Sequence, residues 1–191
     1  MIGNIVAAIT DGGEAATDFE SIATVTLSGT QANIEFTSIP GTYKHLQLRG
    51  FAQCNRSTYG TDDIKMQFNS DTGSNYSFHA VRGTGAAAES TSGVSQAHIL
   101  LVPGAGTQTG TATFCATITD ILDYTDTNKY TTVRVLNGTD LNGTVAGFPG
   151  YVALSSGSWR NTNAITSIKM TINTGASFTQ YTHFALYGIK G

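Results

Sequence analysis

Strict alternation of apolar and polar residues is the pattern that most constrains this chain of 191 residues. Ile64, Met66 and Phe68, for example, are separated by Lys65 and Gln67. Successive side chains of a β-strand point to opposite faces of its sheet, so a period of two predicts strands with one buried face. The same alternation recurs in the stretches 23–27, 33–37, 45–49, 112–119, 133–135, 168–172 and 183–187. No stretch shows a convincing helical period.

Residues that favour turns separate these stretches. Gly tolerates a left-handed backbone, and Asn, Asp and Ser bond to their own backbone, so clusters of these residues predict turns. We expect turns at 28–30, 71–73, 137–138, 142–143 and 173–175.

A continuous apolar run at 99–102 predicts a strand that is buried on both faces. The run ends at Pro103, and we interpret the glycine-rich stretch 104–110 that follows as a hairpin loop. Residues 85–89 and 120–126 each have a composition that suits a single helical turn.

Together the strands predict an all-β fold, namely an antiparallel two-sheet β-sandwich that is jelly-roll-like. About ten short strands at regular spacing are typical of such folds, and another Greek-key sandwich is the alternative. The sandwich forms a single domain, 19–191. Residues 1–18 differ from it by their small and acidic side chains, so we interpret them as an N-terminal arm outside the sandwich.

Charged residues make up only 12% of the chain, against about 25% in an average protein, and the net charge is −3. The sequence has no basic cluster, so we expect no nucleic-acid partner. No apolar run approaches the roughly 18 residues that a membrane helix requires, so we expect no membrane insertion. Cys54 and Cys115 fit no zinc spacing and are expected to be buried or half-buried free thiols.

No residue pattern in the chain indicates catalysis. The Asp-Thr-Gly tripeptide at 71–73 matches that of aspartic proteases, but their chemistry needs a second carboxylate and no second copy exists, so we expect an Asx turn. Asp120, Asp123 and Asp126 do not follow the alternating spacing of a calcium loop. The four histidines form no paired metal motif, and no Gly-x-Ser-x-Gly elbow is present. We therefore expect no enzyme, no cofactor and no metal site.

Two features are candidates for binding a partner. Trp159 and Arg160 could stack on a sugar or anchor a protein contact, unless Trp159 folds back as a lid on the end of the sandwich. The N-terminal arm could add a strand to the open sheet edge of a neighbour, unless it is the first strand of its own sandwich. The apolar residues of the arm are Ile2, Ile5, Val6 and Ile9.

A family resemblance is carried by the segments 19–25, 36–49, 120–124, 128–130 and 184–189. Together they resemble a group of small virion proteins of tailed bacteriophages, common in phages of aquatic bacteria. The resemblance spans residues 19–190 and does not cover the arm. It implies a component of the virion that is assembled in the host cytoplasm, and it assigns no site residues.

We therefore expect a non-enzymatic structural component of a tailed phage virion, namely a capsid decoration (cement) protein on the particle exterior. The alternatives are a tail-fibre or receptor-binding tip and a carbohydrate-binding module. A fibre normally has repeats or heptads in its shaft, and this sequence has none. The expected partners are other capsid or tail proteins, further copies of the chain in a closed homo-oligomer, most simply a trimer, and a host-surface glycan.

Overall fold

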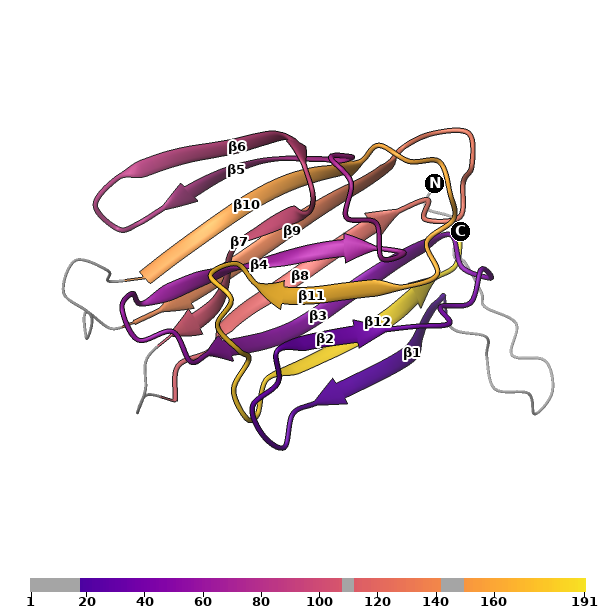
Figure 1. Ribbon diagram of the computed structural model, residues 1–191. Helices are drawn as coiled ribbons and strands as arrows, with labels where there is room; N and C mark the ends of the chain where they lie inside the picture. The colour runs from indigo at the N-terminus through magenta and orange to yellow at the C-terminus, as the bar shows by residue number, and fades with distance from the viewer. Residues whose placement is uncertain (1–17, 108–111, 142–149) are drawn as a thin grey trace, which may run out of the picture.

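The computed structural model describes residues 18–107, 112–141 and 150–191. These residues form twelve strands and no helix, so the prediction of an all-β protein is confirmed (Figure 1). The strands are β1 (Phe19–Thr26), β2 (Asn33–Phe36), β3 (His45–Cys54), β4 (Thr61–Phe68), β5 (Tyr76–Gly83), β6 (Ala88–Gln96), β7 (Ile99–Thr107), β8 (Cys115–Leu122), β9 (Thr131–Asp140), β10 (Gly150–Trp159), β11 (Ile168–Ile172) and β12 (His183–Ile189).

The strands belong to one large mixed sheet with two arms. The longer arm has the order β1-β12-β3-β8-β9-β10-β5-β6 and the shorter arm the order β2-β11-β4-β7, and pairing within each arm is antiparallel. A short parallel pairing joins the arms, where Gln53 and Cys54 of β3 face Gly106 and Thr107 of β7. The sheet is not closed, and a two-sheet jelly-roll sandwich is not confirmed.

Strand β3 belongs to both arms. Its first residues alternate between buried and more exposed positions, as expected for a strand that pairs with β12 and β8 in the longer arm. Its last three residues, Ala52, Gln53 and Cys54, are all buried. The alternation ends there because the strand passes into the junction of the two arms, where both of its faces are covered.

The hydrophobic core lies between the two arms. Strand β7 contacts β5, β8, β9 and β10 of the longer arm, and Figure 1 shows β4 and β11 crossing in front of that arm. Each large apolar side chain that is fully buried here stabilises the fold by about 1.5–3 kcal/mol. The largest buried aromatic side chains are Phe68, Tyr76, Tyr124, Trp159, Phe178 and Phe184.

Trp159 and Asp71 form one corner of this core. Nε1 of Trp159 donates a hydrogen bond to Oδ2 of Asp71 at 2.7 Å, and the indole stacks on Tyr76 with ring centroids 6.3 Å apart. Oδ1 of Asp71 accepts the backbone N–H of Gly73 at 2.8 Å. This bond is the Asx turn predicted for residues 71–73, which is confirmed, and it holds the carboxylate in place for the indole.

Several local predictions are wrong. The expected turn at 137–138 lies inside β9, because β8 and β10 pair with these residues on both sides and outweigh the local turn preference. Residues 104–106, expected in a hairpin loop, continue β7. The stretches 85–89 and 120–126 are not helical, since parts of them belong to β6 and β8. A single turn does form after β8, where the backbone N–H of Asp126 donates to the carbonyl of Asp123 at 2.9 Å.

Two expected features lie outside the described residues. They are the turn at 142–143 and all but the last residue of the N-terminal arm, 1–17.

Cys54 and Cys115 are free and buried, as expected. Burial raises the pKa of the Cys54 thiol to about 11 and that of the Cys115 thiol to about 12. Both thiols therefore stay protonated near neutral pH, and they serve as packing residues rather than nucleophiles.

We predict that Asp71→Ala lowers the free energy of unfolding by about 1–3 kcal/mol, because it leaves the buried N–H of Trp159 without an acceptor. Urea unfolding followed by the fluorescence of Trp159, the single tryptophan, measures this loss. Thr72→Ala is the matched control, since the exposed side chain of Thr72 lies in the same turn. This change should lower the free energy of unfolding by less than about 0.5 kcal/mol. Equal stability of the two variants would contradict the role of this corner.

Candidate functional site

The outward face of the longer arm carries a continuous area of exposed apolar side chains. They come from the adjacent strands β3, β8, β9, β10 and β5, and each is between 40% and 59% exposed. Single exposed apolar residues are normal, whereas a contiguous exposed patch needs an explanation. We define the apolar band as Phe51, Val81, Ile118, Leu136, Val152 and Leu154.

Strand register brings most of the apolar band into one row. Ile118 faces Leu136, and Leu136 in turn faces Leu154. Leu154 then faces Val81. Residues that face each other across antiparallel strands have Cβ atoms about 4.5–5.5 Å apart, so these side chains form an uninterrupted apolar row across the arm.

A second row runs beside the first. Phe51 faces Ala116, and Ala116 faces Gly138. Gly138 then faces Val152. Because Ala116 and Gly138 are small, this part of the apolar band forms a shallow depression. The band is thus a broad, gently hollowed surface, whereas small-molecule sites are deeper and more enclosed.

The packing of β10 explains why its apolar side chains point outward. Val152 and Leu154 are exposed, whereas the buried positions Ala153 and Gly157 carry little or no side chain. A Cβ at Gly157 would lie 2.7 Å from the side chain of Ile99 in β7. Because β7 packs this closely on the middle of β10, only small residues fit inside at positions 153–157, and the large inward residues, Tyr151 and Trp159, lie toward the ends of the strand.

Hydrogen-bonded polar side chains border the apolar band on one side. Nε2 of Gln47 donates to Oδ1 of Asp120 at 2.7 Å, and Nη2 of Arg134 donates to Oδ2 at 2.7 Å. Nε of Arg49 donates to Oε1 of Gln47 at 2.6 Å. Burial alone would raise the pKa of Asp120, but the bonds from Gln47 and Arg134 outweigh it and lower the pKa. The charge of Asp120 is therefore paired at the border of the band.

Aromatic side chains continue the outward face toward β1. Phe51 stacks on His183 with ring centroids 5.2 Å apart, and Phe19 stacks on Tyr187 at 4.7 Å. The guanidinium carbon of Arg49 lies 5.1 Å from the centre of the Phe19 ring. Aromatic residues and arginine are enriched at the energetic centres of protein interfaces, so this composition favours a protein partner.

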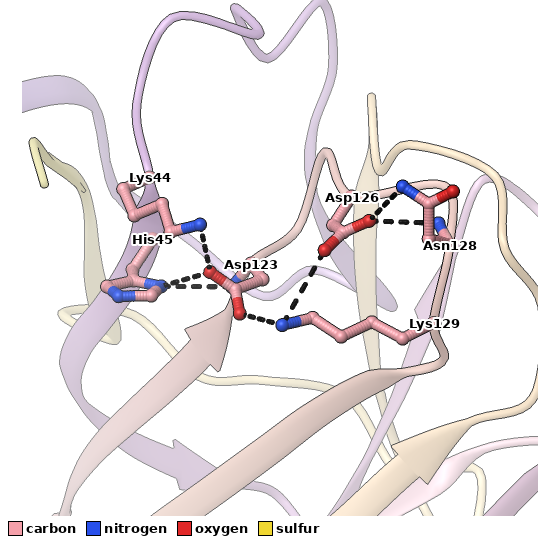
Figure 2. A network of polar contacts seen from close by, with 6 residues as sticks. All are labelled: Lys44, His45, Asp123, Asp126, Asn128 and Lys129. Carbon is pink, nitrogen blue, oxygen red and sulfur yellow. Dashed lines mark hydrogen bonds and ion pairs between the residues drawn. The ribbon is translucent and has the colours of Figure 1, made fainter.

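Asp123 and Asp126, considered above as calcium ligands, belong to an ion-pair network in the turn after β8 (Figure 2). Oδ1 of Asp123 pairs with Nζ of Lys44 at 2.9 Å, and Oδ2 pairs with Nζ of Lys129. Nδ1 of His45 accepts the backbone N–H of Asp123 at 2.9 Å. Hydrogen bonds from Lys129 and Lys44 lower the pKa of Asp123 to about 2. The lysines of the chain itself therefore neutralise this turn.

Trp159 does not form the exposed stacking platform considered from the sequence. Its side chain is only 1% exposed, and the structure shows the alternative, an indole folded into the core. Arg160 is exposed, and its backbone N–H donates to the carbonyl of Asn75 at 2.7 Å. The apolar residues of the N-terminal arm lie outside the described residues; they are Ile2, Ile5, Val6 and Ile9.

No sequence pattern marks the residues of the apolar band as a binding surface. The alternation of large and small residues at 152–155 is a signal that could have indicated β10, although no strand was expected there. Alternation does not show, however, which face of a strand a second layer will cover. The outward direction of Val152 and Leu154 becomes clear only once β7 is placed.

The described part of the chain has no group of three or more His, Cys, Asp or Glu residues that could hold a metal ion. None of the elements in that part is a helix that could cross a membrane. No family model matches the chain, and neither a curated protein nor a solved structure matches it.

We predict that Asp123→Asn lowers the melting temperature at pH 7 and that this loss disappears as the pH falls toward 2. The folded-state pKa of about 2 lies below the ordinary value of 3.8, so the stabilisation is complete above about pH 4 and is lost as the carboxylate is protonated. Glu35→Gln, at an exposed position of β2, is the control. Thermal unfolding of both variants and the wild type between pH 2 and 7 measures this pH dependence. A loss for Asp123→Asn that is the same at every pH would contradict the ion-pair explanation.

Proposed function

We propose that this protein is a non-enzymatic structural component of a tailed bacteriophage particle and that it docks on its protein partners through the apolar band. The resemblance of residues 19–190 to virion proteins supports the phage context. The exposure of six large apolar side chains in adjacent rows supports the docking role and is the observation that carries the proposal.

The physical argument for docking is the cost of leaving the apolar band in water. Removing apolar surface from water is worth about 25 cal/mol per Å², and soluble monomers rarely expose contiguous apolar patches above a few hundred Å². Paired charges lie at the border of the band, at Asp120 and Arg134. A partner can therefore cover the band without burying an unpaired charge.

The rigidity of the surface also supports docking. Strands β8, β9 and β10 each pair with a neighbour on both sides, so the backbone beneath the apolar band is fixed before a partner arrives. A preformed surface loses little conformational entropy on association. This property suits a component that occupies many equivalent positions on a particle.

Within this role we propose a capsid decoration protein on the particle exterior that forms a closed oligomer, most simply a trimer. We also propose that the two arms are the layers of an open jelly-roll-like sandwich, an architecture that is common in viral capsids. Low charge is compatible with a crowded particle surface, where long-range electrostatic steering is not required.

We predict that Leu136→Glu abolishes self-association and binding to particles while the fold is retained, because it places a charge at the centre of the apolar band. Leu136 is 52% exposed, so the isolated protein should remain stable. Light scattering and co-sedimentation with particles measure the two effects. Val94→Glu is the matched control, since Val94 is an exposed apolar residue of β6 outside the band. Wild-type behaviour of Leu136→Glu in both assays would contradict the docking role.

We predict that quantitative mass spectrometry of purified virions finds this chain in hundreds of copies, as symmetric decoration of a capsid requires. A handful of copies would instead favour the tail-tip alternative. Complete absence of the chain from the virions would refute the proposal.

A further inference from the structure

A polar pocket lies at the end of the molecule where β3 and β5 end and β4 and β10 begin, on the left of Figure 1. Its volume is about 300 Å³, at the lower end of the range for small-molecule sites. We define the polar pocket by Arg56, Tyr59, Asp62, Asp63, Arg82 and Tyr151. It is distinct from the apolar band, because Arg82 and Tyr151 point to the inner side of strands whose Val81 and Val152 point outward.

The two adjacent carboxylates of the polar pocket differ in their surroundings. Asp62 is 4% exposed, Oδ2 accepts the hydroxyl of Thr174 at 2.5 Å, and Oδ1 lies 3.5 Å from Nη1 of Arg56. Within the described ranges, no hydrogen bond or ion pair reaches the carboxylate of Asp63. Asp63 is half-buried, and a carboxylate in such a place without a protein partner is open to a ligand that bonds to it.

Cations and aromatic rings surround these carboxylates. The guanidinium carbon of Arg56 lies 4.3 Å from the centre of the Tyr59 ring, and that of Arg82 lies 5.2 Å from the centre of the Tyr151 ring. Arg82 is also held by Glu89, with Nη2 2.7 Å from Oε2. The polar pocket thus presents a hydrogen-bond acceptor, several fixed donors and an aromatic surface within one small volume.

Further polar groups without described partners lie on the inner face of β9, next to β10. Thr139 faces Tyr151 across β9 and β10, and its buried hydroxyl has no hydrogen-bond partner among the described residues. Asn137 faces Ala153, which in turn faces Arg82. Both polar atoms of the Asn137 amide are also buried and have no hydrogen-bond partner among the described residues. These groups do not line the polar pocket and belong to a wider buried set that includes Thr117 and Ser155, so they are not contacts of a ligand in the pocket.

We propose that the polar pocket binds one neutral sugar residue, with its hydroxyl groups bonded to Asp63 and to the arginines and one face of its ring against Tyr59. A hydroxyl both donates and accepts, so it can satisfy a carboxylate and a guanidinium group that lie close together. Asp62, Asp63 and Glu89 place three carboxylates beside the two guanidinium groups of Arg56 and Arg82, which disfavours an anionic ligand. The volume fits one ring rather than several. This inference is independent of the proposed virion role.

The first test is a titration of the full chain with glucose, galactose, mannose and N-acetylglucosamine, followed by two-dimensional NMR. At least one of these sugars should shift the resonances of residues in the polar pocket with a dissociation constant of about 1–10 mM. Asp63→Asn should weaken that binding about tenfold or more, because it removes a charged acceptor. Asp126→Asn, a matched change outside the pocket, should leave it unaltered.

Three outcomes of the titration overturn the proposal. The first is the absence of any shift at about 50 mM sugar, since the dissociation constant would then be far weaker than a useful site has. The second is equal binding by Asp63→Asn and the wild type. The third is tighter binding of glucuronate than of glucose, which would contradict the charge argument. Tyr59→Ala adds a further check, since loss of the ring should weaken binding without affecting the carboxylates.

Thermal unfolding of Asp63→Asn tests separately whether the charged carboxylate of Asp63 destabilises the fold. Burial and the charge of Asp62 raise the pKa of Asp63 to about 6 from 3.8, despite the opposing charges of Arg82 and Arg56. An acid with a raised folded-state pKa destabilises the fold increasingly as the pH rises from about 4 to 6. Asp63→Asn should therefore melt at a higher temperature than the wild type at pH 8 and at a similar temperature near pH 4. A lower melting temperature at pH 8 would show that Asp63 is already satisfied and would overturn the proposal.

Discussion

The packing of β7 against the inner face of the longer arm is the contact on which the rest of the structure depends. Ile99 approaches β10 so closely that Gly157 has no room for a side chain, and Ala153 is the neighbouring small residue on that face. The alternation of the strand then directs Val152 and Leu154 to the outside. The tight packing in the middle of β10 and the outward position of Val152 and Leu154 are therefore linked by one contact, whereas the large inward residues Tyr151 and Trp159 lie toward the ends of the strand.

The same contact separates the two candidate sites. Strands β5 and β10 carry the apolar band on one face, and Arg82 and Tyr151 line the polar pocket from the other. A partner that covers the outward face would leave the pocket at the end of the molecule open. Docking and ligand binding can thus occur together, as they would in a particle component that also contacts a glycan. Under this proposal Asp63 represents a trade-off between stability and binding, since burial raises its pKa and thus disfavours its charged form in the free protein.

Much of the fold could be predicted from the sequence, where local pattern and tertiary pairing agree. The stretches 64–68 and 168–172 alternate clearly and form β4 and β11, and the Asx turn at Asp71 needs only local bonds. Strands β5, β6 and β10 were not predicted, and the latter two are rich in Ser, Gly and Ala. The turn expected at 137–138 gave way to pairing on both sides. The sites were harder still, because a lone tryptophan looks the same in sequence whether it is buried or exposed. The polar pocket joins residues that are far apart in the chain.

Covalent footprinting of exposed side chains with photogenerated carbenes, applied to the protein before and after assembly, tests the role of the outward face most directly. We predict that assembly removes the labelling of Leu136, Val152 and Leu154 and leaves that of Val94 and Tyr59 unchanged. Unchanged labelling of Leu136 and Leu154, together with protection of the edge strand β6, would contradict docking through the apolar band and would show that the chain assembles by pairing of sheet edges.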